Sequence, residues 1–268
     1  MGVINVTPDS FSDGGIALDA AAALHIAQAM QAAGADLIDI GAESTRPGAA
    51  PVVAADERAR LLPVLRALAR DITIPISIDT YKADVASMAL DEGAVIVNDI
   101  SGLAFDPAMG PLVAARGCPA ILMHTRGRPS EMYAHADYLD VVGEVASDLS
   151  RSVERAIASG VRQDGILIDP GLGFAKRAEH SFLALAGIER FAALGFPVVV
   201  GPSRKSFLTA AAGPLDPGAR DWPTAAAVTA AVLGGAHVVR VHRVGDMVSV
   251  VRVADAIRRA AAGEAPAT

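Results

Sequence analysis

Short apolar runs of five residues, rich in β-branched side chains, recur along the whole chain. They lie at residues 2–6, 36–40, 75–79, 95–99, 120–124, 165–169, 197–201 and 237–241. A polar or glycine-containing turn and a longer amphipathic stretch follow each run, most clearly at 19–33, 52–70, 82–92, 137–159 and 247–262. This spacing predicts a buried strand followed by a helix, repeated eight times.

Alternating strands and helices predict a parallel sheet with helices packed outside it. Eight units favour a closed (β/α)₈ TIM barrel of class α/β over an open doubly wound sheet, and the length of 268 residues suits one such barrel. No linker divides residues 1–268, so we expect one domain, with a frayed tail at 260–268. Because a strand begins at once in "MGVINVT", we also expect Met1 to be internal to a longer native chain.

Composition narrows the classes of partner. The formal net charge of −7 disfavours nucleic acid and anionic membranes, which attract basic surfaces. No apolar run reaches the ~18 residues that a membrane span requires. Cys118 is the single cysteine, which excludes an internal disulfide framework and predicts a cytoplasmic protein.

Polar residues stand where nearly every predicted strand ends. They are Asn5, Asp39, Asp79, Asn98, Asp99, His124, Asp169, Ser203, Arg204, Lys205, Arg240 and His242. A single Asp or Asn at such a position often caps the following helix. In a barrel, however, the carboxyl ends of all the strands meet at one mouth, so the repetition predicts a shared polar pocket.

The pocket residues suit a flat heterocycle. Asp79, Asn98 and Asp169 come from three strands, and a carboxylate accepts two parallel N–H bonds from an aminopyrimidine. Lys205 adds a donor for a ring carbonyl or nitrogen, which favours a guanine-like or pterin-like ligand. Phe174, in "DPGLGFAK", either stacks on the ring or packs beside it.

A second group suits a phosphate. Arg240 and His242 are two potential cations, two residues apart and therefore on the same side of a strand. The loops 9–15 and 43–49 are rich in Ser, Thr and Gly, and Arg46 is the candidate clamp for a phosphate or pyrophosphate. Asn5 and loop carboxylates are candidate ligands for Mg²⁺, which prefers oxygen ligands.

Eight segments carry a family resemblance that covers residues 1–250. "MGVINVTPDSFSDGG", "IDIGAESTRPGA", "ISIDTYKADVA", "VIVNDISG", "ILMHTRGRP", "ILIDPGLGF", "GPSRKSFL" and "VVRVH" resemble, in order, the motifs of the dihydropteroate synthase family. The resemblance implies a (β/α)₈ barrel enzyme that condenses 6-hydroxymethyl-7,8-dihydropterin pyrophosphate with p-aminobenzoate. Dihydropteroate and pyrophosphate are the products, Mg²⁺ is the cofactor, and sulfonamides compete with p-aminobenzoate.

The same resemblance implies the roles of individual residues. Asp79, Asn98, Asp169 and Lys205 would hold the pterin, with Met123 and Phe174 lining its pocket. Asn5, Arg240 and His242 would bind the pyrophosphate and its metal, Asn5 as the metal ligand. Loops carrying Asp13, Thr45 and Arg46 would close over substrate, and Ser206 would lie near p-aminobenzoate. The predicted catalytic residues are Asp13, Arg46, Lys205, Arg240 and His242. The resemblance also implies a homodimer formed through helices late in the chain.

Three positions depart from the family pattern. Arg243 replaces an acidic residue beside the pyrophosphate site, and Ala42 and Ala175 replace glycines. Arg243 leaves open a non-catalytic pterin-binding paralogue. A pterin-dependent methyltransferase barrel is a further alternative, but it would need neither a pyrophosphate clamp nor a p-aminobenzoate pocket. The intact "NVTPDSFSDGG" and "SRKS" loops favour the synthase over both.

Overall fold

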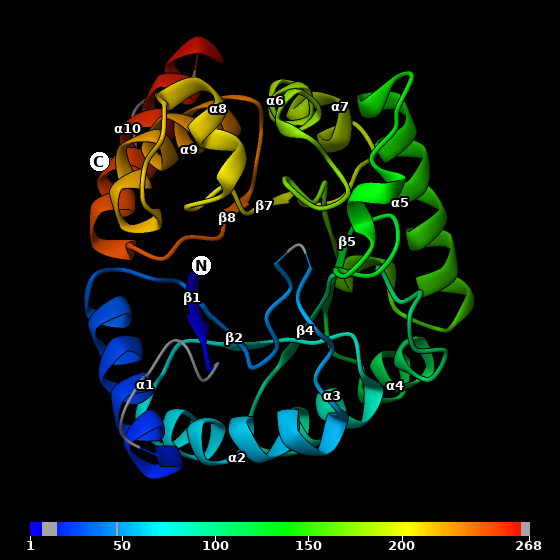
Figure 1. The fold of residues 1–268 in the computed structure, drawn as a ribbon, viewed down its shortest axis with the longest axis vertical. Helices are drawn as coiled ribbons and strands as arrows, with labels where there is room; N and C mark the ends of the chain where they lie inside the picture. Colours follow the sequence, from blue (N-terminus) through cyan, green and yellow to red (C-terminus); the bar gives the residue numbers. More distant parts are fainter. Residues whose placement is uncertain (7–14, 47, 264–268) are drawn as a thin grey trace.

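Parallel strands form the centre of the molecule and the helices lie outside them (Figure 1). The computed structural model describes residues 1–6, 15–46 and 48–263. The strands within this part of the chain are β1 (Gly2–Asn5), β2 (Ile38–Gly41), β3 (Ile76–Asp79), β4 (Ile96–Asp99), β5 (Ala120–Met123), β6 (Ile166–Asp169), β7 (Val199–Val200) and β8 (Val238–Val239).

The strands close into a ring. Strands β1 to β6 pair in sequence order, and β7 pairs with β8, always in parallel. A parallel bridge between Ile168 and Val198 joins β6 to the segment that leads into β7. A second bridge, between Gly2 and Val241, joins the end of β8 to β1, where the Val3 amide donates to the Val241 carbonyl at 3.1 Å. These contacts confirm the predicted barrel, although its last two strands are shorter than the apolar runs at 197–201 and 237–241 indicated.

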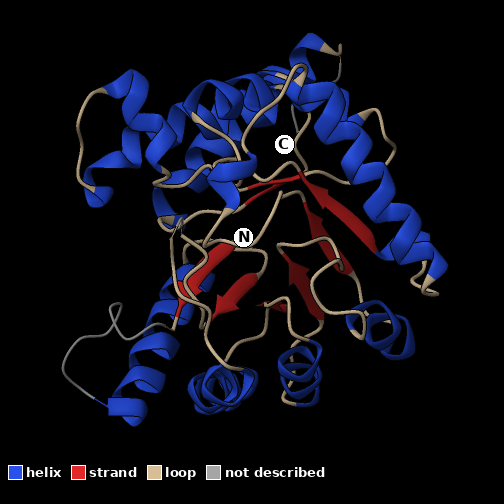
Figure 2. Cartoon of the chain, turned by 45° about the vertical axis from the view of Figure 1, so that its right-hand side comes forward, coloured by secondary structure: helices blue, strands red, loops and turns tan. Residues whose placement is uncertain are grey.

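The helices lie around the strands (Figure 2), and Figure 1 labels them along the chain. They are α1 (Gly15–Ala32), α2 (Ala54–Asp71), α3 (Ala83–Asp91), α4 (Met109–Arg116), α5 (Val141–Ala158), α6 (Ala178–Ala186), α7 (Ile188–Ala192), α8 (Thr209–Ala212), α9 (Asp221–Leu233) and α10 (Val244–Ala261). Helix α2 shows why they pack there: Leu61, Val64, Leu65 and Leu68 are fully buried and lie on one face at helical spacing. Among the described residues, no helix is both long and apolar enough to cross a membrane.

The barrel interior is filled by apolar side chains near the amino ends of the strands. This cluster contains Met1, Leu37, Ile96, Ile121, Leu167, Val199 and Val238. Successive residues of a strand point to opposite faces, so the next inward position on each strand lies two residues later. Those next positions, toward the carboxyl ends, build the candidate site.

Candidate active site

One layer of the barrel interior is polar where a filled barrel would be apolar. Moving two residues on from Leu37, Ile96, Leu167 and Val238 brings the chain to a second inward-facing set. This set consists of Asp39, Asn98, Asp169 and Arg240. Barrel layers draw their side chains from alternate strands, which is the relation among β2, β4, β6 and β8. Strand alternation alone therefore brings these four polar groups to one depth.

Arg240 is the centre of this polar layer. Its Nε donates to Asp39 Oδ2 at 2.6 Å and its Nη2 donates to Asp79 Oδ2 at 2.7 Å. Asn98 Nδ2 also donates to Asp39 Oδ2, at 3.2 Å. Burial alone would lower the pKa of Arg240, but Asp39 and Asp79 outweigh it and raise that pKa. Two of its nitrogens thus bind carboxylates. The sequence pattern did not predict this, because it assigned Arg240 to phosphate binding together with His242.

Asp79 carries a cost of this burial. Removal from water raises the pKa of the Asp79 carboxyl to about 7, and the charge of Arg240 only partly opposes that rise. A carboxyl with a pKa near neutrality changes its protonation in the physiological range. Its ability to accept N–H bonds from a heterocycle is therefore pH-dependent.

Lys205 and Asp169 form the opposite side of the pocket. The Lys205 ammonium donates to the Leu172 carbonyl and lies 4.5 Å from the centre of the Phe174 ring. Burial lowers the pKa of Lys205 to about 8, with Asp169 opposing the shift. Burial also raises the pKa of Asp169, whose Oδ1 accepts from the Gly171 amide at 2.7 Å.

An apolar wall adjoins these charges. Met123, Tyr81 and Ile100 are buried together, and Phe174 and Phe105 pack against them half-buried. The structure thus brings Met123 and Phe174 to the same wall, as predicted. The half-buried Phe174 ring thus lies beside Lys205.

His242 is held by a serine. Ser203 Oγ lies 2.9 Å from His242 Nδ1 and accepts from the His242 amide at 3.2 Å. Burial lowers the pKa of His242 to about 4, and the nearby charge of Arg240 adds to the shift. His242 is therefore a neutral imidazole at neutral pH, not one of the two cations that the pattern predicted.

The two neighbouring arginines face away from this group. Arg204 pairs with Asp221 of α9 at 2.8 and 3.0 Å. Arg243 Nε lies 2.6 Å from Asp246 and 3.7 Å from Asp221. Their charges are matched by carboxylates of α9 and α10, so Arg243 does not displace His242 from Ser203. Arg243, the departure that left a non-catalytic paralogue open, is thus paired with Asp246.

The other predicted residues lie around the mouth. Asn5 is half-buried at the end of β1, Thr45 is half-buried, and Arg46 is exposed in the loop after β2. Ser206 is exposed at the start of the 3₁₀ turn Ser206–Leu208. Within the described residues, none of these four side chains hydrogen-bonds to the polar layer. Asp13 lies outside the described residues.

The donors near Asn5 fit a magnesium ion held chiefly by substrate. No group of three or more His, Cys, Asp or Glu side chains in the described part of the chain is arranged to bind a metal. A half-buried amide at the end of β1 supplies one oxygen. Mg²⁺ characteristically takes one or two protein oxygens and completes its shell with phosphate oxygens and water, so this donor set fits it.

A buried charge cluster below the β2 loop was not predicted. Glu43, one residue before that loop's Ser–Thr–Arg motif, accepts from the Tyr81 hydroxyl at 2.7 Å and pairs with Lys82. Lys82 also contacts the fully buried Glu57 of α2 at 2.5 Å. The cluster fixes the base of the loop that carries Thr45. In the sequence, Glu57 looks like one more charge on an amphipathic helix, so no signal distinguished it.

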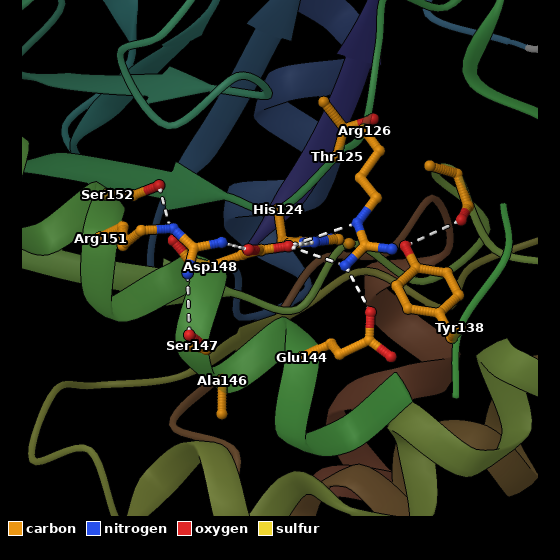
Figure 3. Close-up of polar contacts among 12 residues, drawn as sticks. His124, Thr125, Arg126, Tyr138, Glu144, Ala146, Ser147, Asp148, Arg151 and Ser152 are labelled. Atoms are coloured by element: carbon orange, nitrogen blue, oxygen red, sulfur yellow. Dashed lines mark hydrogen bonds and ion pairs between the residues drawn. The ribbon is translucent and has the colours of Figure 1, made fainter. Parts of the chain in front are cut away.

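A second unpredicted network lies behind the β6 loop. His124 Nε2 lies 3.0 Å from Asp148 of α5, and Arg126 bonds both Asp148 and Glu144 (Figure 3). On its other side, His124 Nδ1 lies 2.7 Å from the Nζ of Lys176. His124 was recognisable as a strand-end residue. Its partners were not, because they come from positions 24 and 52 residues away.

Comparisons with known proteins agree with this geometry. A family model described as pterin binding enzyme matches residues 1–242. A dihydropteroate synthase of Synechocystis is 46% identical over 97% of this chain and 90% of its own length. The solved structure of the Xanthomonas albilineans dihydropteroate synthase with 4-aminobenzoic acid is 38% identical, with a TM-score of 0.90, over 96% of this chain and 92% of that one. The Yersinia pestis dihydropteroate synthase, solved with a sulfonamide drug complex, gives the same identity and TM-score over 96% and 93%.

Proposed function

The chain belongs to the dihydropteroate synthase family, and from that premise we propose that it condenses 6-hydroxymethyl-7,8-dihydropterin pyrophosphate with p-aminobenzoate to give 7,8-dihydropteroate and pyrophosphate. The observation that carries the proposal is the polar layer, with Asn98 and Asp169, together with Asp79, which Arg240 bonds. Asp169 and Asp79 lie near Lys205, which contacts the Phe174 ring. That set matches the edge and the face of a pterin.

Recognition of the pterin follows from hydrogen-bond chemistry. The aminopyrimidine edge of a pterin is rich in N–H donors, which carboxylates accept in pairs. Asp79 and Asp169 supply the acceptors, and Asn98 supplies an amide that both donates and accepts. Lys205 donates to a ring nitrogen or carbonyl and places its charge beside Phe174. The buried setting strengthens each of these bonds relative to water.

The bond changes require no nucleophile on the protein. The C–O bond between the pterin methylene and the pyrophosphate breaks, and the amine nitrogen of p-aminobenzoate forms the new C–N bond and loses a proton. Positive charge develops on the pterin as the C–O bond weakens. Asp79 and Asp169 lie at fixed positions around that ring and stabilise the developing charge electrostatically.

The leaving pyrophosphate is assigned to the mouth of the barrel near Asn5, Arg46 and His242. The neutral His242, held by Ser203, donates one N–H to a phosphate oxygen. Arg46 is exposed and free to move onto an anion, and Asn5 supplies an oxygen to Mg²⁺. Mg²⁺, when bound, would neutralise charge on the departing pyrophosphate. Arg240 retains a further nitrogen, Nη1, beyond the two that bond Asp39 and Asp79.

The second substrate is assigned to the side of Ser206 and the β2 loop. The relatives solved with 4-aminobenzoic acid and with a sulfonamide drug support this class of ligand. Loops bearing Asp13 and Thr45 are proposed to close over it, which positions the amine against the pterin methylene and excludes water. The cluster of Glu43, Tyr81 and Lys82 anchors the second of these loops.

We also propose a homodimer through α9 and α10. These helices pack against each other at one side of the barrel (Figure 1). Apolar side chains stand exposed on both: Trp222 and Leu233 on α9, and Val253 and Ile257 on α10. Exposed apolar side chains on two helices that pack together favour association with another chain.

Competition distinguishes the synthase from a pterin-binding protein without a second substrate. The purified protein is incubated with pterin pyrophosphate, Mg²⁺ and p-aminobenzoate, and dihydropteroate is measured by mass spectrometry at several sulfonamide concentrations. We expect sulfonamide to raise the apparent KM for p-aminobenzoate and to leave the maximal rate unchanged. Absence of product, with pterin bound, would instead support the non-catalytic paralogue.

A further inference from the structure

Lys176 is a fully buried lysine that the proposed chemistry does not use. It is 1% exposed, in the loop that follows β6. Its Nζ has three acceptors: His124 Nδ1 at 2.7 Å, the Phe174 carbonyl at 3.1 Å and the Gly171 carbonyl at 3.2 Å. Burial lowers the pKa of the Lys176 amine well below its ordinary value, and in either protonation state the amine donates N–H bonds to these acceptors. Among the described residues no carboxylate forms an ion pair with it.

The orientation of His124 is fixed from the far side. Asp148 on α5 accepts from Nε2 at 3.0 Å, so that nitrogen carries the hydrogen and Nδ1 presents its lone pair to Lys176. Asp148 is itself held by Arg126 and Arg151 (Figure 3). Burial lowers the pKa of His124, which keeps the ring neutral. A continuous chain of hydrogen bonds therefore runs from α5, through the end of β5, to the loop after β6.

That loop needs external support because its backbone is unusual. Gly171 and Gly173 have φ of 66° and 77°, and Ala175 has φ of 48° without the freedom of glycine. A side chain at Gly171 would collide with the His124 carbonyl oxygen, so the loop lies directly on the backbone that follows β5. Lys176 bonds two of the loop's carbonyls at once, those of Gly171 and Phe174.

The other side of the same loop faces the pterin pocket. The Leu172 carbonyl accepts from Lys205, and the Phe174 ring lies 4.5 Å from the Lys205 ammonium. The carbonyl of Phe174 bonds Lys176 while its ring contacts Lys205, so the two lysines hold one residue from opposite sides. Displacement of the loop would therefore move both the ring and the acceptor that place Lys205.

We propose that Lys176, oriented by His124 and Asp148, is a positioning residue for the pterin half of the reaction. It does not contact substrate but sets the loop that places Phe174 and Lys205. The proposal rests on the proposed function for the identity of the ligand. Lys176 should affect binding of the pterin substrate and not of p-aminobenzoate, and an experiment can detect that difference.

The test compares Lys176→Met with wild type in equilibrium binding of pterin pyrophosphate and in steady-state kinetics with both substrates. We expect the Kd and KM for pterin pyrophosphate to rise roughly tenfold, as for loss of a buried hydrogen bond that holds the loop. The KM for p-aminobenzoate should stay within about twofold. Val153→Ala, which truncates a buried side chain of α5, is the control: it should lower Tm without separating the two KM values.

A double-mutant cycle with Lys205→Met tests the route of action. If Lys176 acts through the loop on Lys205, the fold-increase in pterin Kd of the double variant should be well below the product of the fold-increases of the two single variants. Multiplicative effects, an unchanged pterin Kd in Lys176→Met, or equal rises in both KM values would each overturn the proposal.

Asp148→Ala keeps the test decisive if Lys176→Met fails to fold. This variant removes the outer end of the chain on partly exposed α5, and we expect a smaller rise in pterin Kd with the same separation of KM values. An unchanged Kd would count against the proposal. Failure of the proposed function is a separate result, because wild type would then bind pterin pyrophosphate without forming dihydropteroate, and the binding comparison would still apply.

Discussion

The charge balance of the pocket is set by a few buried side chains. Asp39 and Asp79 share Arg240, while Asp169 lies opposite Lys205. Asp39 is fully buried, and its Oδ1 has no hydrogen-bond partner among the described residues. A buried acceptor without a partner is unfavourable until a donor reaches it. Asp39 Oδ1 is fully enclosed, so it adds negative charge to the polar layer without offering an acceptor at the surface.

The affinity for pterin should depend on pH with two limbs. Asp79, with its pKa raised to about 7, accepts two parallel N–H bonds only when ionised, so affinity falls as pH drops through that value. Lys205, with its pKa lowered to about 8, loses its charge and one of its three N–H donors as pH rises through that value. We expect kcat/KM for pterin pyrophosphate, which reports groups of the free enzyme, to peak between these limits. A flat profile across the neutral range would contradict both assignments.

Removal of the Lys205 ammonium should weaken pterin binding specifically. We expect Lys205→Ala to raise the pterin Kd by about tenfold or more, because a charge-assisted hydrogen bond is lost. The adjacent Arg204 is the matched control, since it pairs with Asp221 away from the pocket, and Arg204→Gln should leave this Kd unchanged. Calorimetric titration measures the pterin Kd of both variants. An equal loss of affinity in the two would contradict the assignment of Lys205 to the pterin pocket.

Asp13 lies outside the described residues, and the family resemblance assigns its motif to closure over substrate. We expect Asp13→Ala to lower kcat much more than it changes the Kd for pterin pyrophosphate, because loop closure acts after that substrate is bound. Single-turnover and binding measurements on the same preparation separate the two effects. Loss of pterin affinity without a change in turnover would reverse the assignment.

At the scale of elements, α5 links stability to the site. Asp140 caps this helix by accepting from the Gly143 amide at 3.0 Å. Glu144 reaches back to the amides of Leu139 and Asp140 at 2.8 and 3.0 Å. These bonds fix the start of α5, about two turns before Asp148, the residue that orients His124. The predicted helix at 137–159 began too early, because the helix starts at Val141, after the cap formed by Leu139 and Asp140.

Loss of the cap should be visible in stability. Asp140→Ala leaves the Gly143 amide without its side-chain acceptor, and such changes cost about 1 kcal/mol. Urea denaturation should show this decrease in the free energy of unfolding. Glu154→Ala, at an exposed position of the same helix, should stay within about 0.5 kcal/mol of wild type. If the two variants were equally destabilised, the cap would not be responsible.

At the scale of the whole molecule, the alternation of strands and helices was readable from the sequence because both periods are local. The polar strand ends predicted a pocket at the barrel mouth, and the structure gathers Asp79, Asn98 and Asp169 there. Which polar groups pair was not readable: Arg240 selects Asp39 and Asp79 only once β8 closes against β1. Magnesium and the cytoplasmic location stay predictions.

The proposed dimer has a built-in reporter. Trp222 is the only tryptophan of the chain and is 87% exposed on α9. If α9 and α10 form the interface, its emission should shift to shorter wavelength as protein concentration rises, and light scattering should give twice the chain mass. Trp222→Glu should favour monomers by placing a charge at an apolar interface. Emission that does not change with concentration, in a protein shown to be dimeric, would place the interface elsewhere.

Pyrophosphate release with and without p-aminobenzoate tests the central assignment most directly. The purified protein receives pterin pyrophosphate and Mg²⁺, and pyrophosphate is followed with a coupled assay while dihydropteroate is quantified in parallel. We predict that p-aminobenzoate strongly accelerates release and that one dihydropteroate forms for each pyrophosphate. Binding of the pterin with no p-aminobenzoate-dependent release would contradict the assignment as a synthase.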